Sequence, residues 1–288
     1  IEAFAVPQGV AVLAKGFWAA KKGRDALKIT WDDAGTEARS SNELIGRFKE
    51  IAKEPGTVAR SEGDVAAGFE QAKTVVEATY TFPYLAHAPM EPEDCVIRRT
   101  DDGGAELLFG SQLQTVDHNV AAAVLGLDLS KVKIKTMLAG GSFGRRATPT
   151  GDMAAEAASV LKAAKHDGPI KIIWTREDDI KGGRYRPIMV HHVKAGLDGD
   201  GNIVAWDQVI VGQSFIKGTP WEQNLMKDGV DHTMVEGASS LPYAIPNLRV
   251  SAHIVEVGVP TLWWRSVGST HTAYATEAFL DQLAEAAG

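Results

Sequence analysis

The chain has 288 residues, of which 44% are hydrophobic and 23% are charged, so it can bury one large core or two moderate ones. A formal net charge of -7, from 30 Lys and Arg against 37 Asp and Glu, argues against a nucleic-acid-binding surface, which needs a concentrated positive field. The single cysteine, Cys95, excludes an internal disulfide, a CxxC metal site and an iron–sulfur cluster carried by this chain alone.

Neither a membrane span nor a signal peptide can be read from the residues. Residues 1–10 lack the basic region and apolar stretch of a signal peptide, and no run of about 18 apolar residues follows. The chain begins with Ile1 and ends in a helical stretch without a closing element, so we expect both ends to be cuts or processing sites. We therefore expect a globular chain with no membrane segment.

The first part of the chain alternates between structured and polar stretches. Its composition predicts a strand, a helix and a second strand at residues 10–14, 17–26 and 27–31. The polar residues 32–62 contain an amphipathic helical pattern at about 42–53 and resemble a connection between two folded parts.

The rest of the chain mixes strand and helix patterns, which predicts an α+β fold. The loop at residues 83–92 contains three prolines and should not be helical. A DGDG sequence at residues 198–201 suits positive φ and predicts a hairpin turn rather than a calcium loop, because Ile203 stands where calcium loops need glycine. We expect helices at residues 113–125, ended by Gly126, at 153–164 and around 276–283, and strands at 74–82, 94–99, 105–110, 131–138, 170–175, 188–197, 202–211 and 248–257.

A glycine-rich segment lies between a predicted strand and a predicted helix. Glycines there let backbone amides approach a phosphate or an oxo group, although such a segment can also be only a turn. The dinucleotide pattern G-x-G-x-x-G is absent. The segment consists of Gly140, Gly141, Ser142, Phe143 and Gly144.

The same five residues match G-x-S-x-G, the nucleophile elbow of serine hydrolases. Ser142 would then be the nucleophile of an acyl-transfer reaction. Pro149 and Gly151 delay the following helix, which weakens this interpretation because the elbow needs a sharp strand-to-helix turn. Four residues could complete a triad, but their types are common and their order along the chain is not evidence for one. They are Asp207, Asp228, His232 and His253.

Several other side chains allow a functional and a structural interpretation. Arg265 lies between aromatic residues and a glycine, where its guanidinium could hold phosphate or pyran oxygens or could pack on Trp263 or Trp264. Arg184 and Arg186 present the same choice. Adjacent residues of a strand point to opposite faces, so His191 and His192 cannot jointly bind a metal. We expect Cys95 to be an inert core thiol.

Four segments in order resemble the xanthine dehydrogenase and aldehyde oxidase family, and within it the isoquinoline 1-oxidoreductase β-subunit type. They are residues 10–33, 87–97 with the sequence Met-Glu-Pro, 111–146 with the glycine-rich segment, and 263–284 with Arg265. The resemblance implies the end of an α/β-hammerhead-like domain at 1–34, a connector at 35–62, and part of a molybdenum-cofactor-binding domain with mixed sheets and flanking helices at 63–288.

The resemblance also implies roles for individual residues. Residues 140–144, with Phe143 at their centre, would line the oxo side of the molybdenum with backbone amides, and Gln112, Arg145 and Arg265 would also bind the cofactor. No side chain would bind the metal directly. We expect residues 140–144 and Arg265 to converge on one cavity.

Departures from the family pattern bear on the substrate. Ala147 stands where the family loop GGGFGGKE carries its glutamate, which argues against xanthine and favours a less polar heterocycle or an aldehyde. Leu85 and Val267 stand where purine-oxidising relatives have a glutamine and a phenylalanine. Arg184 falls at the position of a substrate-orienting arginine in some of these relatives.

The activity implied is that of a molybdenum hydroxylase large subunit, acting on an N-heterocycle or an aldehyde with water-derived oxygen. Its cofactor would be molybdopterin in the cytosine dinucleotide form, and electrons would pass to 2Fe–2S clusters of a small partner subunit, since this chain has one cysteine. The family's catalytic glutamate lies in a Gly-x-Gly-Glu loop that Glu277 and Glu285 do not match, so we expect the chain alone to be inactive. The alternatives are the serine hydrolase and a non-catalytic binding or assembly domain.

Overall fold

The computed structural model describes residues 2–288 and divides into two compact units. The first consists of Ile1–Gly35 and His87–Gly183, and the second of Thr36–Ala86 and Arg184–Gly288. Each unit is therefore assembled from two separate stretches of chain. The division into parts at 1–34, 35–62 and 63–288 that the resemblance implies stays a prediction.

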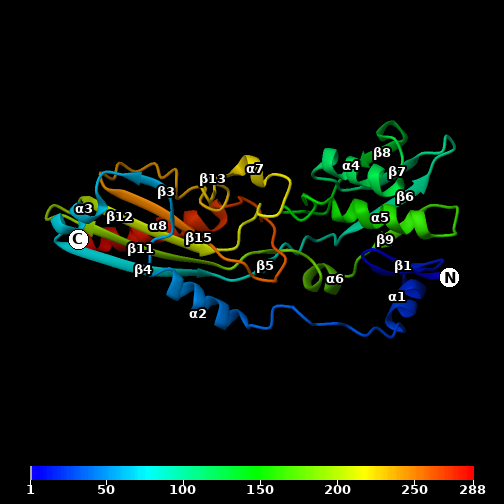
Figure 1. Ribbon diagram of the computed structural model, residues 1–288, viewed down its shortest axis with the longest axis horizontal. Coiled ribbons are helices and arrows are strands. Elements are labelled where there is room, and N and C mark those ends of the chain that lie inside the picture. Colours follow the sequence, from blue (N-terminus) through cyan, green and yellow to red (C-terminus); the bar gives the residue numbers. More distant parts are fainter. Residues whose placement is uncertain (1) are drawn as a thin grey trace. The chain divides into compact units, whose positions relative to one another are not determined.

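The first unit is built on a four-stranded sheet covered by two helices (Figure 1). The β7–β8 pair is parallel and the other pairs are antiparallel. The helix α4 connects β7 to β8, as a parallel pair requires, and ends at Gly126 with φ 71°. In sheet order the strands are β8 (Val132–Thr136), β7 (Ala105–Phe109), β6 (Asp94–Arg99) and β9 (Ile170–Ile173), and the helices are α4 (Gln114–Leu125) and α5 (Asp152–Ala163).

The core of this unit comes from one face of the sheet and the apolar sides of both helices. Ile97 and Leu107 are fully buried strand residues, and Ala121 and Ala157 are fully buried helix residues. Small alanines let α4 and α5 approach each other and the sheet closely. The packing of the helices on the sheet therefore fixes the end of β8 and the start of α5, and the glycine-rich segment runs between these two points.

The N-terminal stretch corrects one sequence prediction. It forms a hairpin of β1 (Glu2–Val6) and β2 (Gly9–Leu13), followed by α1 (Phe17–Asp25). Residues 27–31, predicted as a strand, have no regular structure. Ile29 and Trp31 are 49% and 76% exposed, and a β-prone sequence without neighbours to pack on gains little from strand pairing.

The second unit is built on a five-stranded mixed sheet (Figure 1). Only the β12–β15 pair is parallel, and β11 and β12 form the predicted hairpin. The Asp198 carboxylate closes its turn by accepting from the amides of Asp200 and Asn202, each at 2.9 Å. In sheet order the strands are β3 (Thr57–Glu62), β15 (Leu248–Ile254), β12 (Ile203–Gly212), β11 (Met189–Leu197) and β4 (Thr74–Phe82).

Both faces of this sheet are covered. On β11, Met189 joins the core under α8 (Ser269–Ala287), and the next residue, Val190, joins the core under α2 (Ser41–Ile51). Successive side chains of a strand point to opposite faces, so β11 is buried on both sides, as its apolar sequence requires. The helix α2 lies where a helix was predicted, and its N-terminus has a capping box of Ser40 and Glu43.

Shorter elements complete the structure. The edge strand β3 was not predicted, because its sequence TVARSE is mostly polar. None of the helices within residues 2–288 has both the length and the apolar character needed to cross a bilayer. The remaining elements are α3 (Val65–Gln71), β5 (Leu85–Ala86), a 3-10 helix (Leu129–Lys131), α6 (Arg176–Lys181), β10 (Tyr185–Arg186), α7 (Glu222–Leu225), β13 (Met226–Lys227) and β14 (Val230–Asp231).

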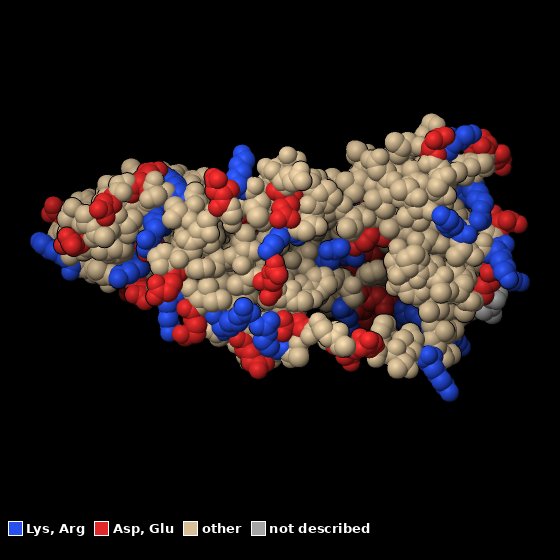
Figure 2. Space-filling view, in the orientation of Figure 1, with Lys and Arg blue, Asp and Glu red and all other residues tan. Residues whose placement is uncertain are grey.

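The α+β class is confirmed in its coarse form by these mixed sheets and their flanking helices. On the face seen in Figure 2, basic and acidic side chains are interspersed over each of the two units. Such mixing keeps the local potential weak on that face.

Candidate functional site

The glycine-rich segment belongs to the first unit, between β8, which ends at Thr136, and α5, which begins at Asp152. Gly141, Phe143 and Gly144 have φ values of 100°, 59° and 106°. Glycine takes this left-handed region freely, whereas a phenylalanine there is strained. Strain at a non-glycine residue is frequent at ligand-binding segments.

Two consecutive turns give this segment its shape. Arg145 N donates to Ser142 O at 3.1 Å, and Ala147 N donates to Gly144 O at 3.0 Å. The Ser142 hydroxyl donates to Gln112 Oε1 at 2.5 Å and accepts from Arg146 N at 3.0 Å. Gln112, which the sequence predicted to share the site, therefore contacts the segment through Ser142.

These contacts do not support the serine hydrolase alternative. The partner of the Ser142 hydroxyl is a side-chain amide, which cannot act as a general base. The chain also continues from the segment to Gly151 before α5 begins, so Ser142 is not at the helix N-terminus of a nucleophile elbow. Two proposed triad members have other contacts: Asp207 pairs with Arg249, and His253 bonds the Glu54 carbonyl.

Three backbone amides of the segment have no hydrogen-bond acceptor among residues 2–288, namely those of Gly141, Ser142 and Gly144. Gly144 is buried, and a buried N–H without an acceptor is costly. Successive N–H groups in a turn with positive φ form a concave site for an anion or an oxygen ligand. The segment therefore presents unused donors.

The Met-Glu-Pro loop lies against the start of the segment. Glu91 Oε2 accepts from Gly140 N at 2.9 Å, and Glu91 N donates to Gly140 O at 3.0 Å. Glu91 Oε1 accepts from Arg146 Nη2 at 3.1 Å. A Cβ atom on Gly140 would lie 2.6 Å from Glu91 Cβ, so this close approach requires glycine.

A group of buried charges supports the end of the segment. Arg145 and Arg146 are 2% and 4% exposed, and Glu93 is 1% exposed. Arg145 pairs with Asp152 at 3.0 Å and stacks over Trp174 at 5.4 Å. These contacts hold the guanidinium of Arg145 in place. Its role in cofactor binding stays a prediction.

Glu93 Oε2 lies 3.9 Å from Arg146 Nη1. Neither carboxylate oxygen of Glu93 has a hydrogen-bond partner within residues 2–288. Burial raises the pKa of this carboxyl to about 7, against the opposing effect of Arg145 and Arg146. No sequence pattern indicated this group, because its members are about 50 residues apart in the chain.

The loop that carries Arg265 belongs to the second unit, directly before α8. Arg265 is exposed and makes no hydrogen bond or ion pair with the described part of the chain. Ser266 and Val267 follow with φ values of 72° and 49°, and a β-branched residue in this region is a clear outlier. At Gly268 a Cβ atom would lie 2.3 Å from Thr233 O, so the backbone of Gly268 packs directly against that of Thr233.

The predicted substrate residues lie in different surroundings. Ala147 is buried in the first unit, whereas Leu85 and Arg184 belong to the second. Leu85 pairs with Arg186 between β5 and β10, and Arg184 directly precedes β10 and is partly buried. Arg186 donates to the Pro83 carbonyl at 2.9 Å. The substrate roles of Ala147, Arg184 and Val267 stay predictions.

The two histidines and the cysteine are as the sequence predicted. His191 is fully buried, and His192, on the opposite face, is partly exposed beside Glu77 at 3.5 Å. Cys95 is 1% exposed, and burial raises the pKa of its thiol, so it is an inert core residue. No group of three or more His, Cys, Asp or Glu in the described residues is arranged to hold a metal ion.

Residues 50–288 match the family model of the molybdopterin cofactor-binding domain. The chain belongs to this family. The molybdopterin-domain assignment agrees with the resemblance to xanthine dehydrogenases and aldehyde oxidases, which the sequence predicted and which is now confirmed.

Three similar proteins illustrate the relationship. The chain is 28% identical to the isoquinoline 1-oxidoreductase subunit beta of Brevundimonas diminuta, over 97% of this chain and 36% of the relative. It is 31% identical to the membrane-bound aldehyde dehydrogenase [pyrroloquinoline-quinone] of Gluconacetobacter polyoxogenes, over 97% of this chain and 37% of that protein. The chain thus spans little more than a third of the length of either relative.

A solved structure, the third of these proteins, shares the fold. The aldehyde oxidoreductase of Desulfovibrio desulfuricans aligns with a TM-score of 0.72 at 20% identity, over 96% of this chain and 30% of that protein. At this identity the likeness shows the fold alone.

The residues of the molybdopterin domain fit its cofactor. The cofactor carries oxygen atoms that accept hydrogen bonds, and the unused amides of Gly141, Ser142 and Gly144 are donors on one turn. A side chain at Gly140 would collide with Glu91, so this position requires glycine. The segment therefore offers donors that suit such oxygen atoms, and its role in binding the cofactor stays a prediction.

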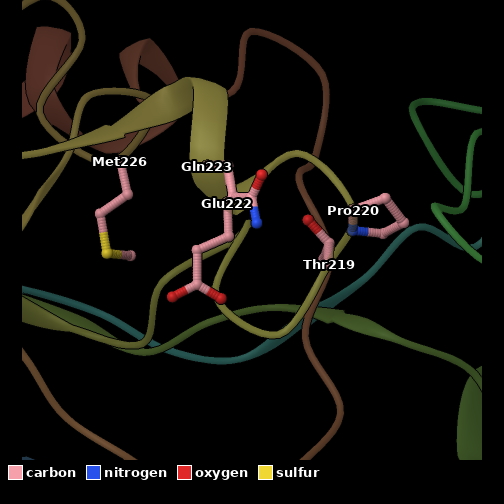
Figure 3. A pocket seen from close by; sticks show the side chains of 5 residues that line it. All are labelled: Thr219, Pro220, Glu222, Gln223 and Met226. Atoms are coloured by element: carbon pink, nitrogen blue, oxygen red, sulfur yellow. The ribbon is translucent and has the colours of Figure 1, made fainter.

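A separate hollow occurs in the second unit of the molybdopterin domain (Figure 3). It is an open depression around α7, and its one titratable lining side chain is Glu222, which accepts from Gly218 N at 2.8 Å. None of its residues was predicted to be functional, and it carries no pair of catalytic groups. The lining residues are Thr219, Pro220, Glu222, Gln223 and Met226.

Proposed function

We propose that this chain is part of the large subunit of a molybdenum hydroxylase that oxidises an N-heterocycle or an aldehyde, with oxygen derived from water. The observation that carries the proposal is the glycine-rich segment of a molybdopterin domain, in which the amides of Gly141, Ser142 and Gly144 have no acceptor within residues 2–288. The names of two relatives, an isoquinoline oxidoreductase and an aldehyde dehydrogenase, support these two substrate classes.

When bound, the cofactor supplies the two-electron oxidation of the substrate carbon. The amides of Gly141, Ser142 and Gly144 would donate hydrogen bonds to cofactor oxygen atoms, where negative charge develops during the reaction. Their orientation is fixed before the cofactor binds, by the contacts of Ser142 with Gln112 and Arg146. Preorganised donors of this kind need little rearrangement during catalysis.

The substrate is proposed to be less polar than a purine. The family's glutamate position is occupied by Ala147, which is buried and has no polar group. Leu85 is 38% exposed and apolar where purine-oxidising relatives have glutamine. Neither residue can pair with the donors and acceptors of xanthine, and an unpaired buried polar group costs binding energy.

Several finer points complete the proposal. The cofactor is the cytosine dinucleotide form, and a small partner subunit carries 2Fe–2S clusters, because the chain has a single cysteine. Residues 1–34 are the end of a hammerhead-like domain, and 63–288 form part of the cofactor domain. Residues 1–288 contain no Gly-x-Gly-Glu sequence, and we expect them to bind without turning substrate over.

The test is a cofactor analysis of the protein purified from its source with its accompanying subunits. Molybdenum is measured by mass spectrometry, the pterin by its fluorescent oxidation products, and pyrroloquinoline quinone by chromatography. We expect about one molybdenum and one pterin per chain, with oxidation of isoquinoline or an aromatic aldehyde and none of xanthine. Protein that contains pyrroloquinoline quinone and no molybdenum would refute the proposal.

A further inference from the structure

A single carboxylate binds the start of the glycine-rich segment and the turn that follows it. Gly140 begins the segment, Arg146 lies within the second turn, and Glu91 binds both, at 2.9 Å and 3.1 Å. The same arginine group donates to the Glu91 and Pro92 carbonyls, at 3.2 Å and 3.3 Å. Arg146 therefore ties the Met-Glu-Pro loop to the segment through both side chain and backbone.

We propose that Glu91 is a positioning residue that holds the glycine-rich segment in its cofactor-binding conformation. Its two carboxylate oxygens have different partners, since one accepts from the amide of Gly140 and the other accepts from the guanidinium of Arg146. The inference rests on the proposed function, because it assigns Glu91 a role toward the cofactor that the segment would bind.

The physical reason lies in the cost of the conformation. Residues 141, 143 and 144 all have positive φ, and Phe143 is strained, so the isolated segment would relax to other shapes. Hydrogen bonds between charged partners are shorter and stronger than neutral ones, and the Glu91–Arg146 pair joins such partners, with Arg146 buried. Holding the chain at Gly140 and again at Arg146 restricts the amides of Gly141, Ser142 and Gly144 to one arrangement.

The length and charge of the side chain are both needed. Aspartate is one methylene shorter, so from the same backbone position it can reach one of the two partners but not both. Glutamine keeps an acceptor for Gly140 N or for Arg146, but it has no charge and only one acceptor oxygen. Glu91→Ala removes both contacts. The three substitutions therefore weaken these contacts to different extents, while the buried Arg146 is left unchanged.

The experiment compares Glu91→Gln, Glu91→Asp and Glu91→Ala in the full protein with its accompanying subunits. A matched control is Glu106→Gln, which removes the exposed ion pair of Glu106 with Arg98 in the same unit. Molybdenum and pterin content, the rate of cofactor loss on dilution, and hydrogen exchange of peptides covering 137–147 are measured. Removal of groups that orient metal ligands typically costs about ten- to hundredfold in metal affinity, and we expect an effect of this order for Glu91.

We expect cofactor loss to accelerate about tenfold or more in Glu91→Ala, with Glu91→Gln and Glu91→Asp between it and the wild type and Glu106→Gln unchanged. Exchange at 137–147 should rise by a similar factor, while β6, β7 and β9 keep their protection. Unchanged exchange in Glu91→Ala, or an equal rise throughout the sheet, would overturn the positioning role. If the wild-type protein holds no molybdenum, the proposed function fails, and with it the role toward the cofactor; the exchange data then still show whether Glu91 holds the segment.

Discussion

His191 Nε2 lies 2.8 Å from His271 Nδ1, and both imidazole rings are fully buried in the second unit. Neighbouring groups determine where their protons lie. Trp206 Nε1 can only donate, so Gln208 accepts through its oxygen and donates through its nitrogen to His191 Nδ1, at 3.0 Å. His191 then donates from Nε2 to His271 Nδ1, and His271 carries its proton on Nε2, which has no partner within residues 2–288. Both rings are neutral.

This pair predicts a loss of stability in mild acid. Burial lowers the pKa of His191 to about 3 and that of His271 well below 6.5. The unfolded chain binds protons at these histidines below about pH 6.5 while the folded chain does not, so stability present above that pH falls as the pH decreases. Each histidine contributes a slope of up to about 1.4 kcal/mol per pH unit.

The measurement is denaturant unfolding of the protein between pH 7 and pH 5, followed through tryptophan fluorescence. Glutamine in place of His271 removes one titrating group, so we expect the His271→Gln protein to lose stability less steeply, by about one proton. Identical slopes for the variant and the wild type would contradict a neutral buried pair.

Glu93 predicts the opposite pH dependence in the first unit. Burial raises its pKa from 4.5 to about 7, so its contribution to stability is fully present below about pH 4.5 and is lost as the pH rises through 7. Glu93→Gln mimics the protonated form at every pH. Relative to the wild type, the variant should gain about 2–3 kcal/mol between pH 5 and pH 8. Unfolding curves at both pH values test this prediction. A stability difference between the variant and the wild type that is the same at pH 5 and pH 8 would show that Glu93 does not titrate in this range.

Gly144→Ala tests the shape of the glycine-rich segment. Gly144 has φ 106°, and alanine there is strained by about 1–3 kcal/mol. The control is Gly103→Ala, at φ 78° in an open turn of the same unit, with nothing within 4 Å of the added Cβ. Both variants should lose stability, but only Gly144→Ala should lose molybdenum and pterin. Equal cofactor content in the two variants would argue against the segment as the binding element.

Arg265→Ala separates cofactor binding from folding in the second unit. Arg265 is exposed and has no hydrogen bond or ion pair in the described chain, so the free energy of unfolding should change by less than about 0.5 kcal/mol. Cofactor retention should nevertheless fall. Arg249→Ala, which breaks the ion pair with Asp207, should lower stability and leave retention unchanged. Normal cofactor content in Arg265→Ala would remove this residue from the proposed site.

Helices and strands with a strong hydrophobic periodicity were predictable from the sequence. Contacts between residues far apart in the chain were not. The apolar residues of 113–125 and the alternation of 202–211 follow from local geometry, and Gly126 ends its helix as expected. The strand predicted at 27–31 failed, because β propensity needs a neighbour to pack on.

The candidate site was predictable only in its local part. The glycine pattern of 140–144 identified the segment, because close backbone approach requires this residue type. Its support came from elsewhere: Glu91 and Glu93 reach Arg146 across about 50 residues, and no spacing rule connects them. His271 likewise showed no signal, since a single histidine on a helix has no periodic partner. Burial and pairing of charges at this range depend on the tertiary fold.

The discontinuous make-up of the units has a consequence during synthesis on the ribosome. The strand β4 ends at Phe82, but its partner β11 begins only at Met189. At roughly 5–20 residues per second, the ribosome needs about 5–20 s to make the intervening segment. Throughout that interval neither edge of β4 is paired, which makes the nascent chain a candidate for chaperone binding until β11 emerges.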